Sequence, residues 1–227
     1  MTEKRNDSPD KVRISTCTFA DALLGETYGY DVQVLDEQAT LQDFLCALSA
    51  YAQKKFADCK GCDGCCHERA PLISLDIPAL ASLLPPDPFP AHQVCRAFAK
   101  VSVDADGVSD IVLRRDEQSC CGCLHLPGKF CTIHPQRPFV CRSHFCPPKT
   151  QRVDWLRQEI VNMGENQLTH MLLAEEAAGA PPLDIGLLNR LLDTADYPPT
   201  PLQGLEQYRQ ARIRALVSPE LWATLRQ

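Results

Sequence analysis

The residues best suited to chemistry in this chain are cysteines, and eight of them recur at short intervals in two clusters. They are Cys59, Cys62, Cys65 and Cys66 in the first cluster, and Cys123, Cys131, Cys141 and Cys146 in the second. A CxxC spacing lets two thiolates of one short loop bind the same soft metal ion, whereas cysteines that serve only packing need no fixed interval. The two clusters therefore predict a metal centre.

The total cysteine count and the sequence flanking the clusters favour metal binding over disulfide bonding. The chain has 13 cysteines, an odd number that cannot be fully paired within one molecule. Met1 to Val12 is polar, with no apolar segment behind it, and no stretch reaches the roughly 18 apolar residues needed to span a membrane. We therefore expect a cytoplasmic protein without membrane association, in a compartment where thiols stay reduced.

Three thiolates of the first cluster match the density with which one loop surrounds an iron–sulfur cluster. These are Cys59, Cys62 and Cys65, which lie within seven residues. In such sites the fourth ligand comes from a distant part of the sequence. Cys146 is our candidate for it, because Pro147 follows directly, as in the Cys-Pro ending of bacterial ferredoxin ligand runs.

The adjacent pair Cys65 and Cys66 suggests a second set of thiols. Neighbouring side chains of an extended segment point to opposite sides, so both are not expected to bind one ion. Either a second metal is present, or one of the two thiols lies behind the ligands. The second set consists of Cys66 together with Cys123, Cys131 and Cys141.

Zinc is the alternative metal. Cys120 and Cys123 form a further CxxC that would pair with Cys59 and Cys62 in a site of four cysteines. Such pairs usually lie roughly 12 to 20 residues apart, much closer than here, although long insertions add little closure entropy. On this alternative the protein is a zinc-stabilised, non-catalytic binding module.

The charge distribution isolates the second cluster. The chain has a net charge of −6 and a pI of about 5.5, which argues against nucleic acid and anionic membranes as partners. Between Gln118 and Val153 there is no acidic residue, and five basic residues leave −11 for the remainder. They are Lys129, Arg137, Arg142, Lys149 and Arg152. We expect this basic segment to offset a thiolate-bound centre; the alternative is an exposed patch for an anionic ligand.

Several single residues near the clusters have weaker interpretations. Four histidines lie close to cysteines, and with eight thiolates present we interpret them as hydrogen-bond donors behind the ligands. They are His67, His125, His134 and His144. The isolated Cys17, Cys46 and Cys95 are expected to pack as small hydrophobic residues.

Local patterns predict the elements that position the clusters. Apolar residues at helical spacing predict a helix from Ala39 to about Ala57 that leads into Cys59. Shorter signals predict a helix capped by Asp76, a helix over 90–100, hairpins over Val101–Arg115 and Leu124–Ile133, and a short helix opened by Pro135 that carries Cys141. A long helix is expected over Thr150–Ala178, and three more helices follow it.

These elements predict a mostly α fold, α+β with small hairpins, in which an irregular cysteine-rich metal-binding core packs with helices. We divide the chain into an N-terminal tail and mixed segment (1–37), a cysteine-cluster domain (38–150) and an α-helical C-terminal extension (151–227) that offers a surface for a protein partner.

Two sequence blocks resemble the CxxCxxCC cysteine-cluster family of zinc- or iron-chelating proteins, whose members include the flagellin lysine N-methylases. The first block is Cys59-Lys-Gly-Cys62-Asp-Gly-Cys65-Cys66, and the second runs through Cys123-Leu-His-Leu126, Cys131-Thr-Ile-His134, Arg137-Pro138-Phe-Val-Cys141-Arg142 and Cys146. The family pattern maps its eight cysteines onto the eight named above. The resemblance implies a 4Fe-4S cluster as cofactor and, for the methylase branch, methyl transfer from S-adenosylmethionine.

The sequence predicts an iron–sulfur cluster-binding protein with a redox or substrate-binding role. The chain has no nucleophile triad, phosphate-binding glycine loop or HExxH helix, so no substrate follows from its motifs.

Overall fold

The computed structural model describes residues 11–21, 25–55, 68–85, 90–103, 109–114, 125–126, 130–131, 133–181, 183 and 195–227. The chain divides into two compact units. Unit 1 combines Met1–Asp58, Phe145–Ile160 and Gln207–Gln227, and unit 2 combines Cys59–His144 and Val161–Glu206. Each unit is thus built from segments that are distant in the sequence.

Unit 1 begins with an antiparallel hairpin of β1 (Val12–Asp21) and β2 (Gly25–Val34). Every second residue at the end of β2 is buried, namely Tyr30, Val32 and Val34. This period of two is that of a strand with one face against a core. The sequence analysis assigned no element here, because the polar residues of the outer face obscure the alternation.

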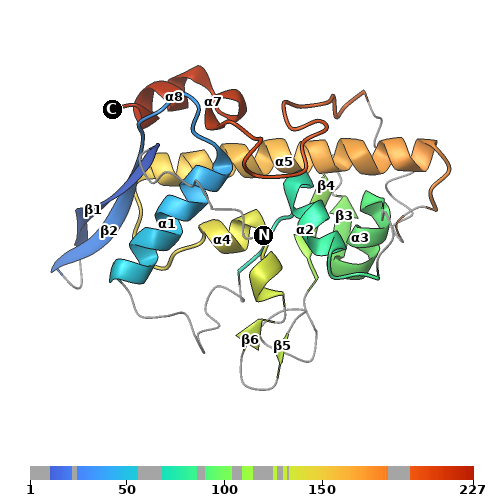
Figure 1. Ribbon diagram of the computed structural model, residues 1–227, viewed down its shortest axis with the longest axis horizontal. Coiled ribbons are helices and arrows are strands. Elements are labelled where there is room, and N and C mark those ends of the chain that lie inside the picture. Colours follow the sequence, from blue (N-terminus) through green and yellow to red (C-terminus); the bar gives the residue numbers. More distant parts are fainter. Residues whose placement is uncertain are drawn as a thin grey trace, which may run out of the picture. The chain divides into compact units, whose positions relative to one another are not determined.

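Helix α1 (Leu41–Lys55) confirms the helix expected before the first cluster. It begins where Thr40 and Asp43 cap each other: the Asp43 carboxylate accepts from the Thr40 amide at 2.8 Å, and the Thr40 hydroxyl accepts from the Asp43 amide at 3.3 Å. Phe44 and Leu48 of α1 are fully buried, and α1 contacts β1 (Figure 1). Two short helices near the C-terminus, α7 (Ile213–Leu216) and α8 (Pro219–Leu225), also belong to unit 1.

Unit 2 alternates short helices with two small hairpins. Its helices are η2 (Ser74–Asp76), α2 (Ile77–Ala81), α3 (Ala91–Phe98), η3 (His134–Gln136) and α4 (Phe139–Ser143). Its strand pairs are β3 (Ala99–Val103) with β4 (Ser109–Leu113), and β5 (His125–Leu126) with β6 (Phe130–Cys131). The predicted helices and both predicted hairpins are confirmed.

Two details of unit 2 differ from expectation. The helix that carries Cys141 begins after Pro138 and not at Pro135, which lies in the separate turn of η3. The side chain of Asp76 forms no hydrogen bond that caps α2, because its carboxylate is engaged elsewhere.

The long helix α5 (Gln151–Ala177) confirms the helix expected over 150–178, and Figure 1 draws it as one continuous ribbon. Its residues up to Ile160 belong to unit 1, and those from Val161 onwards belong to unit 2. In unit 2, Leu168 and Leu172 join a core that includes Leu72 and Ile111. The described residues thus form an α+β structure, and none of their helices is both long and apolar enough to cross a bilayer.

Candidate metal centre

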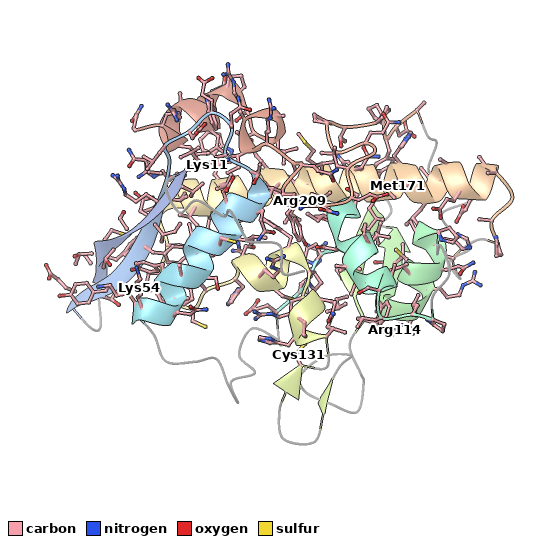
Figure 2. The ribbon with its side chains drawn as sticks, in the orientation of Figure 1. Lys11, Lys54, Arg114, Cys131, Met171 and Arg209 are labelled. Carbon is pink, nitrogen blue, oxygen red and sulfur yellow. The ribbon has the colours of Figure 1, made fainter. Side chains whose placement is uncertain are left out.

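The structure describes three of the eight cluster cysteines. Cys131 lies in β6 (Figure 2) and Cys141 in α4, both half-buried and both in unit 2. Cys146 is exposed and belongs to unit 1. The other five lie outside the described residues: Cys59, Cys62, Cys65, Cys66 and Cys123.

The three described cysteines do not make a metal site by themselves. In the part of the chain that the structure covers, no three side chains of His, Cys, Asp or Glu come together as a set of ligands. What the structure does describe is how the segments on either side of the clusters are anchored.

The first anchor is the carboxylate of Asp76, a fully buried residue of unit 2. One oxygen accepts from the amide of Ile73 at 2.8 Å, and the other accepts from the amide of Phe139 at 2.8 Å. Phe139 is the first residue of α4, so the negative charge also lies at the positive end of that helix. Asp76 thereby ties the segment that follows the first cluster to the helix that carries Cys141.

The second anchor is a pair of backbone hydrogen bonds between Ala70–Leu72 and β4. The amide of Leu72 donates to the carbonyl of Ile111 at 2.8 Å, and the amide of Leu113 donates to the carbonyl of Ala70 at 2.9 Å. The chain that leaves the first cluster therefore runs beside the strand that leads towards the second cluster.

The third anchor holds the residues around Cys146 in unit 1. The ring of Phe145 lies 5.4 Å from that of Tyr30 and 6.1 Å from that of Tyr51. Tyr51 belongs to α1, the helix that leads towards Cys59. Cys146 is thus held beside the helix that precedes the first cluster.

On the other side of Cys146, the chain pairs with β2. The amide of Tyr30 donates to the carbonyl of Pro148 at 2.9 Å, and the amide of Thr150 donates to the carbonyl of Tyr30 at 3.1 Å. This approach requires a glycine at position 29, because a Cβ there would lie 2.1 Å from the Pro148 oxygen. The backbone that follows Cys146 is therefore fixed to the hairpin.

Part of the basic segment has a structural use that its composition did not reveal. The guanidinium of Arg152 forms a double hydrogen bond with the carboxylate of Asp31, whose pKa is lowered because the hydrogen bonds from Arg152 and Thr150 outweigh the cost of burial. Lys149 lies 3.2 Å from Asp154. Each of these two charges therefore neutralises a carboxylate within unit 1, and the expectation that the basic segment offsets a metal centre stays a prediction.

Arg137 also has a local partner, since its Nε donates to the carbonyl of His134 at 3.1 Å. The His134 residue itself is exposed.

A half-buried carboxylate, that of Glu165, lies next to the second anchor. Burial raises the pKa of Glu165 to about 7, although Arg69 and a hydrogen bond from the amide of Ile111 act in the opposite direction. Arg69 is held mainly by Asp110, and its nitrogen lies 3.9 Å from Glu165. The preceding residue, Gly164, packs so closely on Ile73 that a Cβ would lie 2.4 Å from the Ile73 Cβ.

The sequence analysis missed two of these positioning residues and identified one packing residue. Asp76 was interpreted as a local helix cap, and nothing in the sequence indicates its bond to a residue 63 positions away. Tyr30 gave no signal at all. Cys95 is fully buried, as expected for a packing residue, and burial raises the pKa of its thiol to about 12, which keeps it protonated.

No family model, no curated protein and no solved structure matches this chain. The function must therefore be argued from the cysteine motifs and from the three anchors.

Proposed function

We propose that this chain binds a 4Fe-4S cluster through its two cysteine clusters, as in the CxxCxxCC family that its motifs resemble. The ligands of the cluster are Cys59, Cys62, Cys65 and Cys146, and the second set of thiols is Cys66, Cys123, Cys131 and Cys141. When bound, such a cluster supplies one-electron redox chemistry or a site for a substrate anion.

The observation that carries the proposal is that segments flanking both cysteine clusters are anchored within the folded units. The Asp76 carboxylate bonds to Ile73, which follows the first cluster, and to Phe139, which precedes Cys141; the pairing of Tyr30 with Pro148 fixes the chain after Cys146. Anchored flanks favour metal binding, because a preformed backbone reduces the entropy lost when distant thiolates converge on one centre.

The chemistry of the described cysteines is compatible with this proposal. Cys131 and Cys141 are half-buried and Cys146 is exposed, so none of the three is sealed in an apolar core as Cys95 is. A thiol must lose its proton to bind metal, and partial exposure lowers the cost of that ionisation.

The test is to purify the full chain without oxygen and to measure iron, acid-labile sulfide and zinc per chain. We expect iron and sulfide in equal amounts and a brown protein. Cys146→Ser should lower both contents, whereas Cys95→Ser, at a buried position away from the clusters, should leave them unchanged.

Two outcomes would contradict the proposal. Zinc without sulfide would replace the iron–sulfur centre with a structural zinc site, and the protein would then be a binding module. Absence of all three, with a cystine bond between the two clusters, would remove metal binding altogether.

A further inference from the structure

Three charged side chains of unit 2 lie together beside the second anchor. They are Arg69, directly before Ala70, Asp110 of β4 and Glu165 of α5. The Arg69 guanidinium forms a double hydrogen bond with the Asp110 carboxylate, in which Nε donates to Oδ2 at 3.2 Å and Nη2 donates to Oδ1. The same Nη2 lies 3.9 Å from Oε1 of Glu165. One guanidinium is thus bound by one carboxylate and lies within reach of a second.

The Glu165 oxygen that faces Arg69 is buried and has no hydrogen-bond partner among the described residues. The same carboxyl group accepts from the amide of Ile111, so its other oxygen is engaged. A buried polar atom without a partner calls for a specific explanation. Burial disfavours the charged carboxylate and raises the pKa of Glu165 to about 7. Glu165 therefore changes its charge near neutral pH, with one oxygen open towards the guanidinium.

The two carboxylates differ in how well water solvates them. The side chains of Arg69 and Asp110 are 58% and 36% exposed, and exposed ion pairs contribute little to stability. The Glu165 side chain is only 14% exposed, so its negative charge needs a nearby cation once it forms. Shortening the separation from 3.9 Å to the length of a charge-assisted hydrogen bond, about 2.8 Å, requires a guanidinium shift of about 1 Å. Ionised Glu165 is therefore the stronger acceptor for Arg69.

We propose that Arg69 exchanges between Asp110 and Glu165 under the control of a single proton. With Glu165 protonated, Asp110 binds the guanidinium, as in the structure. When Glu165 releases its proton to water, the guanidinium moves onto Glu165 Oε1, and its hydrogen bonds to Asp110 open. Among the described residues, Arg69 and Asp110 are the charged groups that act on Glu165. The inference goes beyond the proposed function and is independent of it, because no cysteine takes part.

The exchange changes the attachment of the chain that runs into the second anchor. Arg69 directly precedes Ala70, whose carbonyl accepts from the amide of Leu113 at 2.9 Å. In the protonated form the Arg69 side chain ties this segment to β4, and in the ionised form it ties the segment to α5. A rise in pH through neutrality is thereby converted into a change of partner between two elements of unit 2.

The test is to determine crystal structures of the full chain about 1.5 units below and above the Glu165 pKa of about 7. The carboxyl carbon of Glu165 is titrated by NMR over the same range. The variant Glu165→Gln keeps the shape of the side chain and cannot ionise. The control is Glu68→Gln, which removes an exposed carboxylate next to Arg69 in the sequence.

We expect Arg69 to be bound by Asp110 at the lower pH. At the higher pH the distance from Nη2 to Glu165 Oε1 should fall to about 2.8 Å, with Asp110 beyond hydrogen-bond reach. Glu165→Gln should keep Arg69 on Asp110 at both pH values, and Glu68→Gln should behave as the parent does. Asp110→Asn removes the competing carboxylate, so it should lower the midpoint of the Glu165 titration by about one unit or more.

Two results would overturn the inference. In the first, Arg69 stays on Asp110 at both pH values in the parent protein, a measurement that depends on no variant. In the second, Arg69 changes partner in Glu165→Gln as it does in the parent, which would place the controlling proton elsewhere. Neither result bears on the metal content, so the proposed function is tested separately.

Discussion

Replacement of Asp76 is the most direct test of how the cysteine segments are held. The carboxylate accepts two hydrogen bonds from buried backbone amides, those of Ile73 and Phe139, each at 2.8 Å. Hydrogen bonds to a charged group contribute about 1.5–3 kcal/mol each. Asp76→Ala should therefore lower the free energy of unfolding by about 3–6 kcal/mol, a large share of the 5–15 kcal/mol typical of a folded domain.

Asp76→Asn separates the two hydrogen bonds from the volume of the side chain. The amide keeps one acceptor oxygen, but its NH2 group faces a backbone N–H and cannot accept from it. We expect a loss of about 2–4 kcal/mol, smaller than that of the alanine variant. Asp154→Asn is the control, because its side chain is 56% exposed and surface ion pairs contribute at most about 1 kcal/mol.

The assay is urea unfolding of the reduced, metal-free protein, followed by circular dichroism at 222 nm, together with hydrogen exchange at the two amides. Both amides should be protected in the parent protein and exchange faster in the variants. An Asp76→Asn protein that unfolds within about 1 kcal/mol of the parent, or a Phe139 amide that exchanges equally fast in both, would refute this account of the anchor.

Three further predictions concern the same two units. The pKa of Glu165 is raised from 4.5 to about 7 on folding, so the folded protein holds the Glu165 proton more tightly than the unfolded chain does. The resulting stabilisation is fully present below about pH 4.5, and the free energy of unfolding falls by about 3 kcal/mol as the pH rises from 4.5 through 7. Glu165→Gln should flatten the fall of the urea midpoint between pH 5 and 8, and an unchanged fall would exclude Glu165 as its source. Gly164→Ala should lower the melting temperature, because the clash with Ile73 costs about 1–3 kcal/mol and outweighs the gain of up to about 1 kcal/mol in helix propensity; a higher melting temperature would mean that Ile73 yields. Gly29→Ala should also lower the melting temperature, since the new Cβ would clash with the backbone oxygen of Pro148, which cannot rotate away. A variant that melts at the same temperature as the parent would disprove the close approach.

Local sequence signals predicted most helices and the two small hairpins. The helical spacing of Phe44 and Leu48 was enough to predict α1. These features act over one or two turns of chain, which is the range over which propensity and periodicity carry information.

The contacts that position the candidate site could not be predicted, because they join residues far apart in the sequence. The bond from Asp76 to Phe139 spans 63 residues, and the pairing of Arg152 with Asp31 spans 121. A carboxylate before a helix is usually its cap, and a basic residue near cysteines is usually free to offset their charge. The distant partners of Asp76 and Arg152 can be identified only once the fold is known.

The pairing of β2 with the segment after Cys146 has a consequence for biosynthesis. The Thr150 hydroxyl donates to the Asp31 carboxylate at 2.5 Å, and the two residues are 119 positions apart. The β1–β2 hairpin can therefore pair with the segment around Thr150 only after most of the chain has left the ribosome. Closing so long a loop is slow compared with forming α1 or a local hairpin. The pairing that fixes the chain after Cys146 should therefore form late in synthesis, and nascent chains stalled before residue 150 should lack the hydrogen bonds between β2 and this segment.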